Sequence, residues 1–287
     1  DVVLSYTIKC NVFGALATMG TRTPFIPNVT GLGTAFLSGR LLQTAVEMLY
    51  RLAFRDLEVI YFQNSDDRAY FIERGLARVE QTTLLPGSGV DLNHFAVTPM
   101  PPLDAPPIFL MVSRLLRDKG VFEFVEAARQ IKATRSDARF QILGAVGSQN
   151  RSAIDAKTVQ AWIDEGAIEY LGATSDVRPF IALATCVVLP SYREGAPRTL
   201  IEAAAMARPL IATDVPGCRI VIDRNQSGFF CAAQDSSSLV EAIVRMLAQS
   251  PQARIEMGRA GRAKMEREFD EKLIVDSYYN ALKYVTE

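Results

Sequence analysis

Short apolar segments alternate with longer amphipathic segments along almost the whole chain. The short segments are rich in Val, Ile and Phe, whereas the longer ones show helical periodicity of apolar residues. This alternation is typical of βαβ units, in which helices connect parallel strands. It predicts strands at residues 2–6, 25–29, 58–63, 82–85, 108–113, 139–143, 168–171, 186–190, 210–213 and 228–231.

The amphipathic segments predict the helices that connect these strands. In the helix predicted at residues 38–55, Leu41, Ala45, Leu49 and Leu52 fall on one face. The other predicted helices span residues 11–19, 65–73, 120–132, 152–164, 176–183, 198–207, 237–247, 251–268 and 271–285.

A proline-rich run divides the alternating pattern into two parts. Five prolines occur in TPMPPLDAPP, residues 98–107, a sequence that can neither pair within a sheet nor continue a helix. We therefore expect an interdomain linker at residues 101–107, a first domain at residues 1–100 and a second at residues 108–270. Ligands of open α/β sheets bind outside the carboxyl ends of the strands, so two doubly wound domains would face a binding cleft.

Composition and charge argue against a nucleic-acid binder, a His/Cys zinc site and a membrane-spanning segment. The chain has 287 residues and a net charge of −1, without the basic excess that is typical of nucleic-acid binders. Its four cysteines form no CxxC pair, and the single His94 cannot complete a His/Cys zinc site. Cys186, in an apolar run, is interpreted as a buried free thiol in a reducing cytoplasm. No apolar run is long enough to span a bilayer.

The first segment with candidate chemistry is VSRLLRDKG, residues 112–120. A predicted strand ends here, a turn carries Arg114, Arg117 and Lys119, and a helix is predicted to begin near Gly120. Cations at a strand end, beside the free N–H groups of a helix, can bind an anion. The alternative interpretation is ordinary solvated surface charge.

The second segment is SYREGAPRTLIEAAAMARP, residues 191–209. Glu194 lies in the loop after a predicted strand, and Glu202 lies inside the helix that follows. Pro197 stands where this helix begins, and proline is favourable in the first turn of a helix. The two carboxylates are separated by about a dozen ångström, because a helix rises ~1.5 Å per residue. They therefore suit two hydroxyl-bearing groups on either side of a diphosphate rather than one metal ion. The alternative is that Glu194 is a surface residue and Glu202 pairs with a neighbouring Arg.

These segments resemble a known family of enzymes. Glu194 and Glu202, with seven residues between them in S-Y-R-E-G-A-P-R-T-L-I-E, are similar to the E-x7-E signature of the retaining GT-B glycosyltransferases of family 4. VSRLLRDKG resembles that family's phosphate-binding segment, and PGSGVDLNHF, residues 86–95, resembles its interdomain segment. The last helices resemble the crossover with which the chain returns to the first domain. The resemblance implies two Rossmann-like domains of the GT-B type, of which the N-terminal one is incomplete here.

The resemblance also implies roles for individual residues of the second domain. Arg114 and Lys119 would neutralise the nucleotide diphosphate, Glu194 would bind hydroxyls of the donor sugar, and Glu202 would accept hydrogen bonds from the ribose. The backbone would face the phosphates or the sugar at Gly195, Ala196, Thr199 and Leu200. The strand ends that would flank the base carry Leu143, Gly144 and Leu171.

On the acceptor side, SYTIKCNVFG at residues 5–14 and IPNVTGLGTAF at residues 26–36 resemble motifs of enzymes that extend sugars on a polyprenyl diphosphate. The candidate acceptor-side residues are Lys9, Asn11, Thr30, Gly31 and Gly33. Many relatives carry a His where Thr30 stands, so no role for such a His can be transferred. Lys9 and Asn11 could also simply begin a helix. For His94 we expect a structural role.

The implied function is a retaining, metal-independent transfer of a hexosyl or N-acetylhexosaminyl group from a nucleotide sugar, with UDP as the expected nucleotide. The acceptor would be a saccharide, carried on a polyprenyl diphosphate, in surface polysaccharide synthesis. No cofactor and no metal are expected, because cations and helix N–H groups would stabilise the leaving diphosphate. Two alternatives stay open: a nucleotide-sugar-binding subunit without catalysis, and a sugar-nucleotide 2-epimerase.

Two further expectations concern the start of the chain and the location of the protein in the cell. The family begins with a βα unit whose glycine-rich loop approaches the donor phosphates, and since Asp1 opens directly into a strand we expect a segment upstream of it. We expect a cytoplasmic protein. The helix at residues 38–55, with Arg40, Arg51 and Arg55 beside apolar residues, would suit the inner face of the membrane. The same pattern also fits a core-packing helix with solvated arginines.

Overall fold

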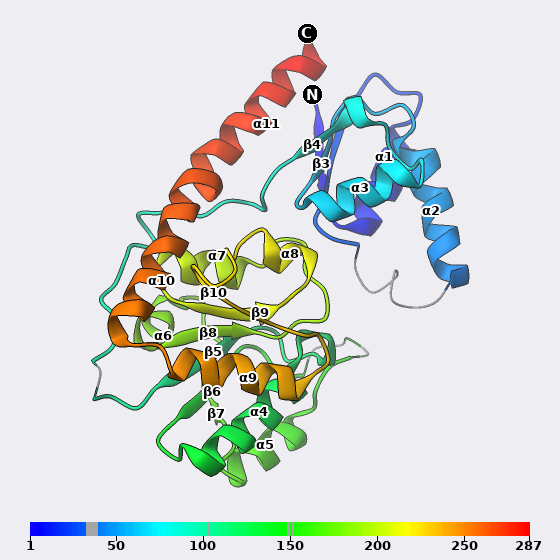
Figure 1. Ribbon diagram of the computed structural model, residues 1–287. Coiled ribbons are helices and arrows are strands. Elements are labelled where there is room, and N and C mark those ends of the chain that lie inside the picture. Colours follow the sequence, from blue (N-terminus) through cyan, green and yellow to red (C-terminus); the bar gives the residue numbers. More distant parts are fainter. Residues whose placement is uncertain (33–39, 103, 148–149, 151) are drawn as a thin grey trace. The chain divides into compact units, whose positions relative to one another are not determined.

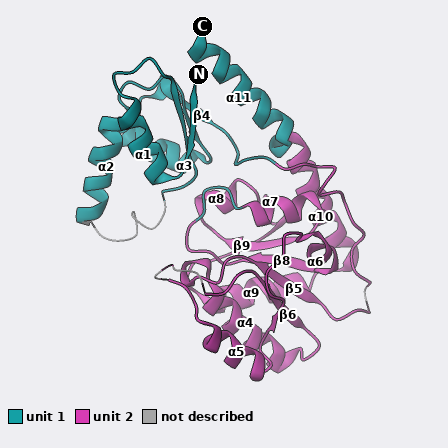
Figure 2. Ribbon diagram, turned by 180° about the vertical axis from the view of Figure 1, so that it is seen from behind, with its two compact units in different colours: residues 1–89, 194–197, 268–287 teal, residues 90–193, 198–267 magenta. Residues whose placement is uncertain are grey.

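The computed structural model describes residues 1–32, 40–102, 104–147, 150 and 152–287. The chain divides into two compact units (Figure 2). The first unit consists of residues 1–89, 194–197 and 268–287, and the second of residues 90–193 and 198–267. Each unit is built on one parallel sheet with connecting helices (Figure 1), which confirms the predicted α/β class.

The sheet of the first unit has the strand order β1-β2-β3-β4, and all its strand pairs are parallel. Parallel sheets are covered on both faces, so their strands are continuously apolar or buried rather than alternating. Every residue of β2 is indeed buried. The strands are β1 (Val3–Tyr6), β2 (Phe25–Val29), β3 (Ile60–Phe62) and β4 (Thr82–Leu84).

Helices from the two ends of the sequence cover opposite faces of this sheet. Phe25 and Val29 of β2 belong to one apolar cluster with residues of α1 (Ile8–Thr18), α2 (Arg40–Phe54) and α3 (Ser65–Glu73). Ile26, which alternates with them along the strand, packs instead with α11 (Glu271–Thr286). The first unit therefore contains a helix from the far end of the chain (Figure 1).

The sheet of the second unit has the order β10-β9-β8-β5-β6-β7, again with parallel pairs only. Read from β7, this is the doubly wound order 3-2-1-4-5-6, whose direction reverses between β5 and β8. The strands are β5 (Ile108–Val112), β6 (Arg139–Leu143), β7 (Glu169–Tyr170), β8 (Cys186–Leu189), β9 (Leu210–Thr213) and β10 (Gly228–Cys231).

The largest apolar cluster of the second unit lies on one face of its sheet, under α4 (Val121–Thr134), α5 (Ala156–Asp164) and α9 (Ser236–Leu247). Phe109 and Met111 of β5 point into this cluster, whereas Leu110 between them is buried on the other face. The remaining helices are α6 (Arg178–Leu183), α7 (Arg198–Ala205), α8 (Pro216–Arg219) and α10 (Pro251–Lys264), followed by a π-helix at Met265–Phe269.

Several helices differ from the predicted boundaries, and a local cap explains one of these differences. The fifth helix begins at Ala156 rather than near residue 152, because the Asp155 carboxylate accepts a hydrogen bond from Thr158 N at 2.7 Å and caps it. The first helix begins at Ile8, before the predicted start. The helix predicted over residues 251–268 is α-helical only to Lys264. The one-turn helix α8 was not predicted.

The proline-rich run lies inside the second unit, whose first residue is Val90. A fully buried arginine, Arg208, explains this position, because its guanidinium donates to the carbonyl oxygens of Thr98 at 3.0 Å and Pro99 at 2.7 Å. The division of the chain thus falls within PGSGVDLNHF, after Gly89, rather than at residues 101–107 as we expected.

Candidate functional site

The two predicted motifs of the second unit follow β5 and β8, the strands between which the winding direction reverses. Such a switch point is where doubly wound sheets bind ligands. The two loops are joined by a hydrogen bond from Tyr192 N to Asp118 O at 2.9 Å. Gly120, with φ of 75°, also lies directly against Pro190, since a Cβ atom there would be 2.1 Å from Pro190 O. The structure therefore brings the two motifs together.

The cations of the first motif differ in what surrounds them. The Arg114 side chain is exposed, and Lys119 is half-buried in the one-turn 3-10 helix Arg117–Lys119. Arg117, by contrast, stacks its guanidinium 4.5 Å from the centre of the Phe122 ring. The neighbouring Leu115 and Leu116 are buried. The loop is thus anchored by its leucines and presents Arg114 and Lys119 beside the end of β5.

The strand ends that were predicted to flank a base lie next to this loop. Leu143 is the buried last residue of β6 and pairs with Val112 in the register of the sheet. Gly144 comes so close to β5 that a Cβ atom would be 1.8 Å from Ser113 O. Its carbonyl accepts a hydrogen bond from Tyr170 Oη at 2.8 Å. Leu171 donates its N–H to Ile142 O at 2.9 Å.

The first turn of α7 is fixed to the end of β5. Thr199 donates its hydroxyl to Val112 O at 2.9 Å, and Leu200 is fully buried in the core. The amino end of α7 therefore lies beside the loop that carries Arg114 and Lys119. N–H groups at a helix start carry positive partial charge, so this corner of the second unit combines three sources of positive potential.

Glu202 lies on α7, with a side chain that is only 13% exposed. Burial raises its carboxyl pKa, while the charges of Arg198 and His94 act in the opposite direction. Arg198, four residues earlier, reaches Glu202 Oε1 at 3.1 Å from an exposed position. The ion pair that the sequence offered as an alternative is thus present, and it leaves the second carboxylate oxygen for another partner.

His94 has structural contacts in the second unit. Arg178 Nη1 lies 3.3 Å from both the Nδ1 atom and the carbonyl oxygen of His94. The imidazole also packs edge-on against Phe95, with 5.0 Å between ring centres.

Two features of the site were not found by sequence reasoning. The Ser191 hydroxyl, at the start of the second motif, is fully buried and has no hydrogen-bond partner among the described residues. Tyr192 donates its hydroxyl to Glu123 Oε1 at 2.8 Å, and burial together with this bond raises the tyrosine pKa to about 12. The only sequence signal was that both residues stand inside the second motif.

The remaining predicted residues lie in the first unit or outside the described chain. Asn11 is buried there, accepts a hydrogen bond from Ser5 Oγ at 2.9 Å and donates to Asn28 O at 2.8 Å, so its amide already holds β1 to β2. Lys9 is exposed on α1. Thr30 and Gly31 follow β2, whereas Gly33 lies outside the described residues. Glu194, Gly195 and Ala196 fall in residues 194–197, which belong to the first unit.

The second unit matches a family model. The model described as Glycosyl transferases group 1 covers residues 106–249, which is half of the chain and includes both motifs around β5 and β8.

Two curated relatives cover most of the chain. N,N'-diacetylbacillosaminyl-diphospho-undecaprenol alpha-1,3-N-acetylgalactosaminyltransferase of Campylobacter jejuni is 27% identical over 97% of this chain and 75% of its own length. UDP-Gal:alpha-D-GlcNAc-diphosphoundecaprenol alpha-1,3-galactosyltransferase of Escherichia coli is 24% identical over 86% of this chain and 66% of its own length. The chain spans less than half, 44%, of a further relative, the capsular polysaccharide glycosyltransferase CapM of Staphylococcus aureus.

Solved structures share the fold. HepE of Anabaena, in complex with UDP, superimposes with a TM-score of 0.82 at 20% identity, over 99% of this chain and 79% of that protein. At this identity the likeness concerns the fold alone.

Proposed function

Because the chain belongs to the group 1 glycosyl transferases, we propose that it transfers a hexosyl or N-acetylhexosaminyl group from a UDP-sugar to a lipid-linked saccharide. The names of two relatives support the acceptor class, since both act on saccharides linked to diphospho-undecaprenol, and one of them uses a UDP-sugar. Synthesis of a surface polysaccharide or glycan is the corresponding process.

The observation that carries the proposal is the meeting of two motifs at the switch point of the second sheet. Arg114 and Lys119 lie on one loop, and the amino end of α7 is tied to the strand before that loop by Thr199. A diphosphate at this corner would find both side-chain cations and helix N–H groups. Glu202, one turn further along α7, would accept a hydrogen bond from a ribose hydroxyl.

The same groups account for the chemistry of transfer. When the anomeric C–O bond breaks, the sugar takes on oxocarbenium character and the bonding electron pair leaves with the diphosphate oxygen. Positive charge at this oxygen stabilises the transition state more than the ground state, and so lowers the barrier. We propose that Arg114 and Lys119 supply this charge without a metal ion, and that the transfer retains the anomeric configuration.

Calorimetric titration of UDP tests the donor site. We expect saturable binding that is equal with Mg²⁺ and with a chelator, and that Lys119→Ala and Glu202→Ala each weaken at least tenfold, about 1.4 kcal/mol. Lys157→Ala, which removes one exposed charge from α5, is the matched control and should change nothing. Binding that disappears with the chelator would contradict metal independence. Equal affinity in all variants would contradict the assigned site.

The exposed face of α2 supports a proposal about the acceptor's surroundings. Leu41 and Met48, which share one face of the helix, are 91% and 62% exposed, and Leu42, Leu49 and Leu52 extend the apolar face. The described helices include none that is long and apolar enough to cross a membrane. A polyprenyl-linked acceptor is held in a bilayer, and we propose that this face of α2 lies in the membrane interface beside it.

Vesicle flotation tests this part of the proposal. Leu41→Glu combined with Met48→Glu should remove binding to vesicles that contain anionic phospholipid, because two charges would enter the interface. Val244→Glu on α9, also an exposed apolar position at 50%, is the control and should leave flotation unchanged. Arg55 is paired with Asp56 at 2.9 Å, so the apolar face rather than this arginine should carry the binding. Unchanged flotation of the double variant would refute the proposed surface.

A further inference from the structure

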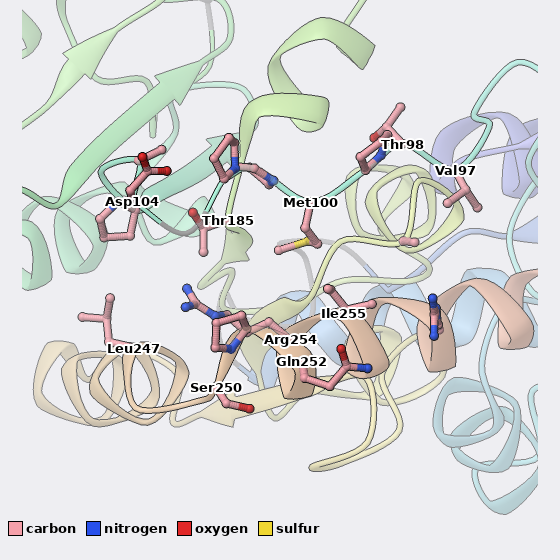
Figure 3. Close-up of a pocket in the computed structure, with 18 of the residues that line it drawn as sticks. Val97, Thr98, Met100, Asp104, Thr185, Leu247, Ser250, Gln252, Arg254 and Ile255 are labelled. Atoms are coloured by element: carbon pink, nitrogen blue, oxygen red, sulfur yellow. The ribbon is translucent and has the colours of Figure 1, made fainter.

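A large cavity lies in the second unit, away from the motifs described so far. Its volume is about 1010 Å³, and Figure 3 shows residues of the stretch from Val97 to Asp104 along one side and residues of α9 and α10 along the other. Three of its lining residues stand just before strands: Pro107 before β5, Thr185 before β8 and Ala207 before β9. The cavity is therefore at the amino edge of the sheet, whereas the candidate donor site is at the carboxyl edge.

One wall of the cavity is held in place by buried polar contacts. Arg208 donates to Thr98 Oγ1 at 2.7 Å as well as to the carbonyl oxygens of Thr98 and Pro99, and its Nη1 lies 3.7 Å from Met100 Sδ. On the same edge, Thr185 Oγ1 accepts a hydrogen bond from Ile108 N at 3.0 Å. Pro99, Pro101 and Pro102 of this wall each have a φ angle that the ring fixes. A ligand would thus meet a preformed cavity and lose little affinity to ordering it.

Two cations that line the cavity, Arg254 and Arg259, make no side-chain hydrogen bond or ion pair with the described residues. Arg135 pairs with Asp137 at 3.0 Å, but the half-buried Arg254 side chain makes no hydrogen bond or ion pair with the described residues. Burial lowers the pKa of Arg254, and the positive charge of Arg135 adds to this effect. A guanidinium that has lost water and lies near a like charge is stabilised by an anion. Arg259 and the carboxylate Asp104, both exposed, also line the cavity.

We propose that this cavity binds a small phosphorylated organic molecule, with its phosphate on Arg254. The guanidinium fork matches the oxygen geometry of a phosphate, and the volume is at the upper end of the ~300–1,000 Å³ of small-molecule sites. The prolines of the wall, with Leu247 and Ile255, offer apolar surface for the body of the ligand. The site does not depend on the proposed transferase activity, and it uses none of the residues of the donor site.

Titration of glucose 6-phosphate into the whole chain, followed by calorimetry, tests the proposal. We expect saturable binding that Arg254→Ala weakens by about tenfold or more. Arg254→Lys keeps the charge but loses the forked geometry of the guanidinium, so it should lose less affinity for glucose 6-phosphate than Arg254→Ala does. It replaces the alanine variant in the test if that variant fails to fold. Lys157→Ala is the matched control for charge, and Lys119→Ala tests for occupation of the donor site; neither should change the affinity. Gluconate, which offers a carboxylate instead, should bind more weakly.

Each contrary result overturns the proposal. Absence of saturable binding at about 10 mM, where a dissociation constant of ~1 mM would be measurable, refutes a phosphate site. A loss in Lys157→Ala equal to that in Arg254→Ala shows non-specific attraction. A loss confined to Lys119→Ala places the ligand in the donor site. Gluconate binding as tight as that of the phosphate ester refutes the chemical class. Failure of UDP binding, in contrast, would concern only the proposed function.

Discussion

Arg208 shows at the residue scale how a polar side chain can organise a fold without a charge partner. Its guanidinium donates to backbone oxygens of two stretches, residues 98–99 and residues 181–182, and burial lowers its pKa to about 10. These bonds hold the proline-rich stretch to the end of α6. Sequence reasoning assigned no role to this arginine, because these partners are backbone atoms that lie between 26 and 110 residues away along the chain.

Replacing Arg208 should therefore be costly. Arg208→Met keeps the bulk but removes all the hydrogen bonds that the buried guanidinium donates, and we expect a loss of about 3 kcal/mol in the free energy of unfolding. Urea denaturation measures it. Arg135→Met removes an exposed guanidinium from the same region and should cost under ~1 kcal/mol. Similar losses in the two variants would show that the buried bonds contribute little.

Glu202 leads to a prediction about pH. Burial raises its carboxyl pKa above the ordinary value, so the folded state disfavours the charged form. The contribution of this group to stability is then fully present below its unfolded pKa, and it is lost as pH rises through the folded pKa. Glu202→Gln should accordingly be more stable than the wild type at neutral pH, and this advantage should vanish towards acid pH. Thermal unfolding at a series of pH values measures it, and an advantage that grows on acidification would contradict the assigned shift.

At the scale of elements, the candidate site depends on how closely the loops after neighbouring strands approach each other. Gly120 and Gly166 have nearly the same backbone angle, φ of 75° and 72°, but only Gly120 faces a neighbour, Pro190 O, within reach of a Cβ atom. Alanine at either position lowers the free energy of unfolding by roughly 1–2 kcal/mol, because a residue with a Cβ atom disfavours the left-handed conformation. The two glycines therefore separate backbone strain from the close approach of the loops.

We expect Gly120→Ala to lose more unfolding free energy than Gly166→Ala, by at least ~1 kcal/mol, because the loop must move away from Pro190. The same movement displaces Lys119, so UDP affinity should fall at least several-fold in Gly120→Ala and stay unchanged in Gly166→Ala. Chemical denaturation and calorimetry measure the two effects. Equal behaviour of both variants would show that the contact between the loops is unimportant.

The bounds of helices and strands were predicted correctly where the pattern of apolar residues was continuous. The prediction failed where contacts between residues distant in the sequence determine the structure. β2, α3, β6, β9 and β10 have the predicted bounds, because buried parallel strands and capped helices have strong local signals. The positions of the two motifs after strands were predicted, but the strand order that places them at a switch point comes from the structure. The proline run, in contrast, was read as a free linker, since nothing local reveals the distant Arg208. Residues 194–197 belong to the first unit through contacts that a sequence does not show.

At the scale of the whole molecule, the first unit is completed by the end of the chain. Tyr278 of α11 is half-buried against Tyr61, with ring centres 4.9 Å apart, and its hydroxyl accepts a hydrogen bond from Asn28 Nδ2 at 2.8 Å. The Tyr61 hydroxyl in turn donates to Ser277 O at 2.8 Å. Periodicity predicted the helix itself, but only the resemblance to a family indicated where it returns.

Tyr278→Ala should consequently loosen the sheet of the first unit. We expect a loss of about 2 kcal/mol in the free energy of unfolding, with faster amide hydrogen exchange in β2 and β3, because a half-buried aromatic ring and a hydrogen bond disappear. The neighbouring Tyr279 is 57% exposed, and Tyr279→Ala should cost less than ~1 kcal/mol. Exchange that stays slow in β2 and β3 of the first variant would contradict the role of α11.

The return of α11 also sets an order of events during synthesis. Residues 1–89 leave the ribosome before the second unit, yet one face of their sheet is covered only after residue 268, roughly 180 residues later. At ~5–20 residues per second, that face waits on the order of 10–40 s while the second unit is made. Ile26, Tyr61 and Leu85 are meanwhile without their cover. A nascent chain of this kind has a built-in need for chaperones, and a chain interrupted before α11 carries an exposed apolar face by which proteases can recognise it as unfinished.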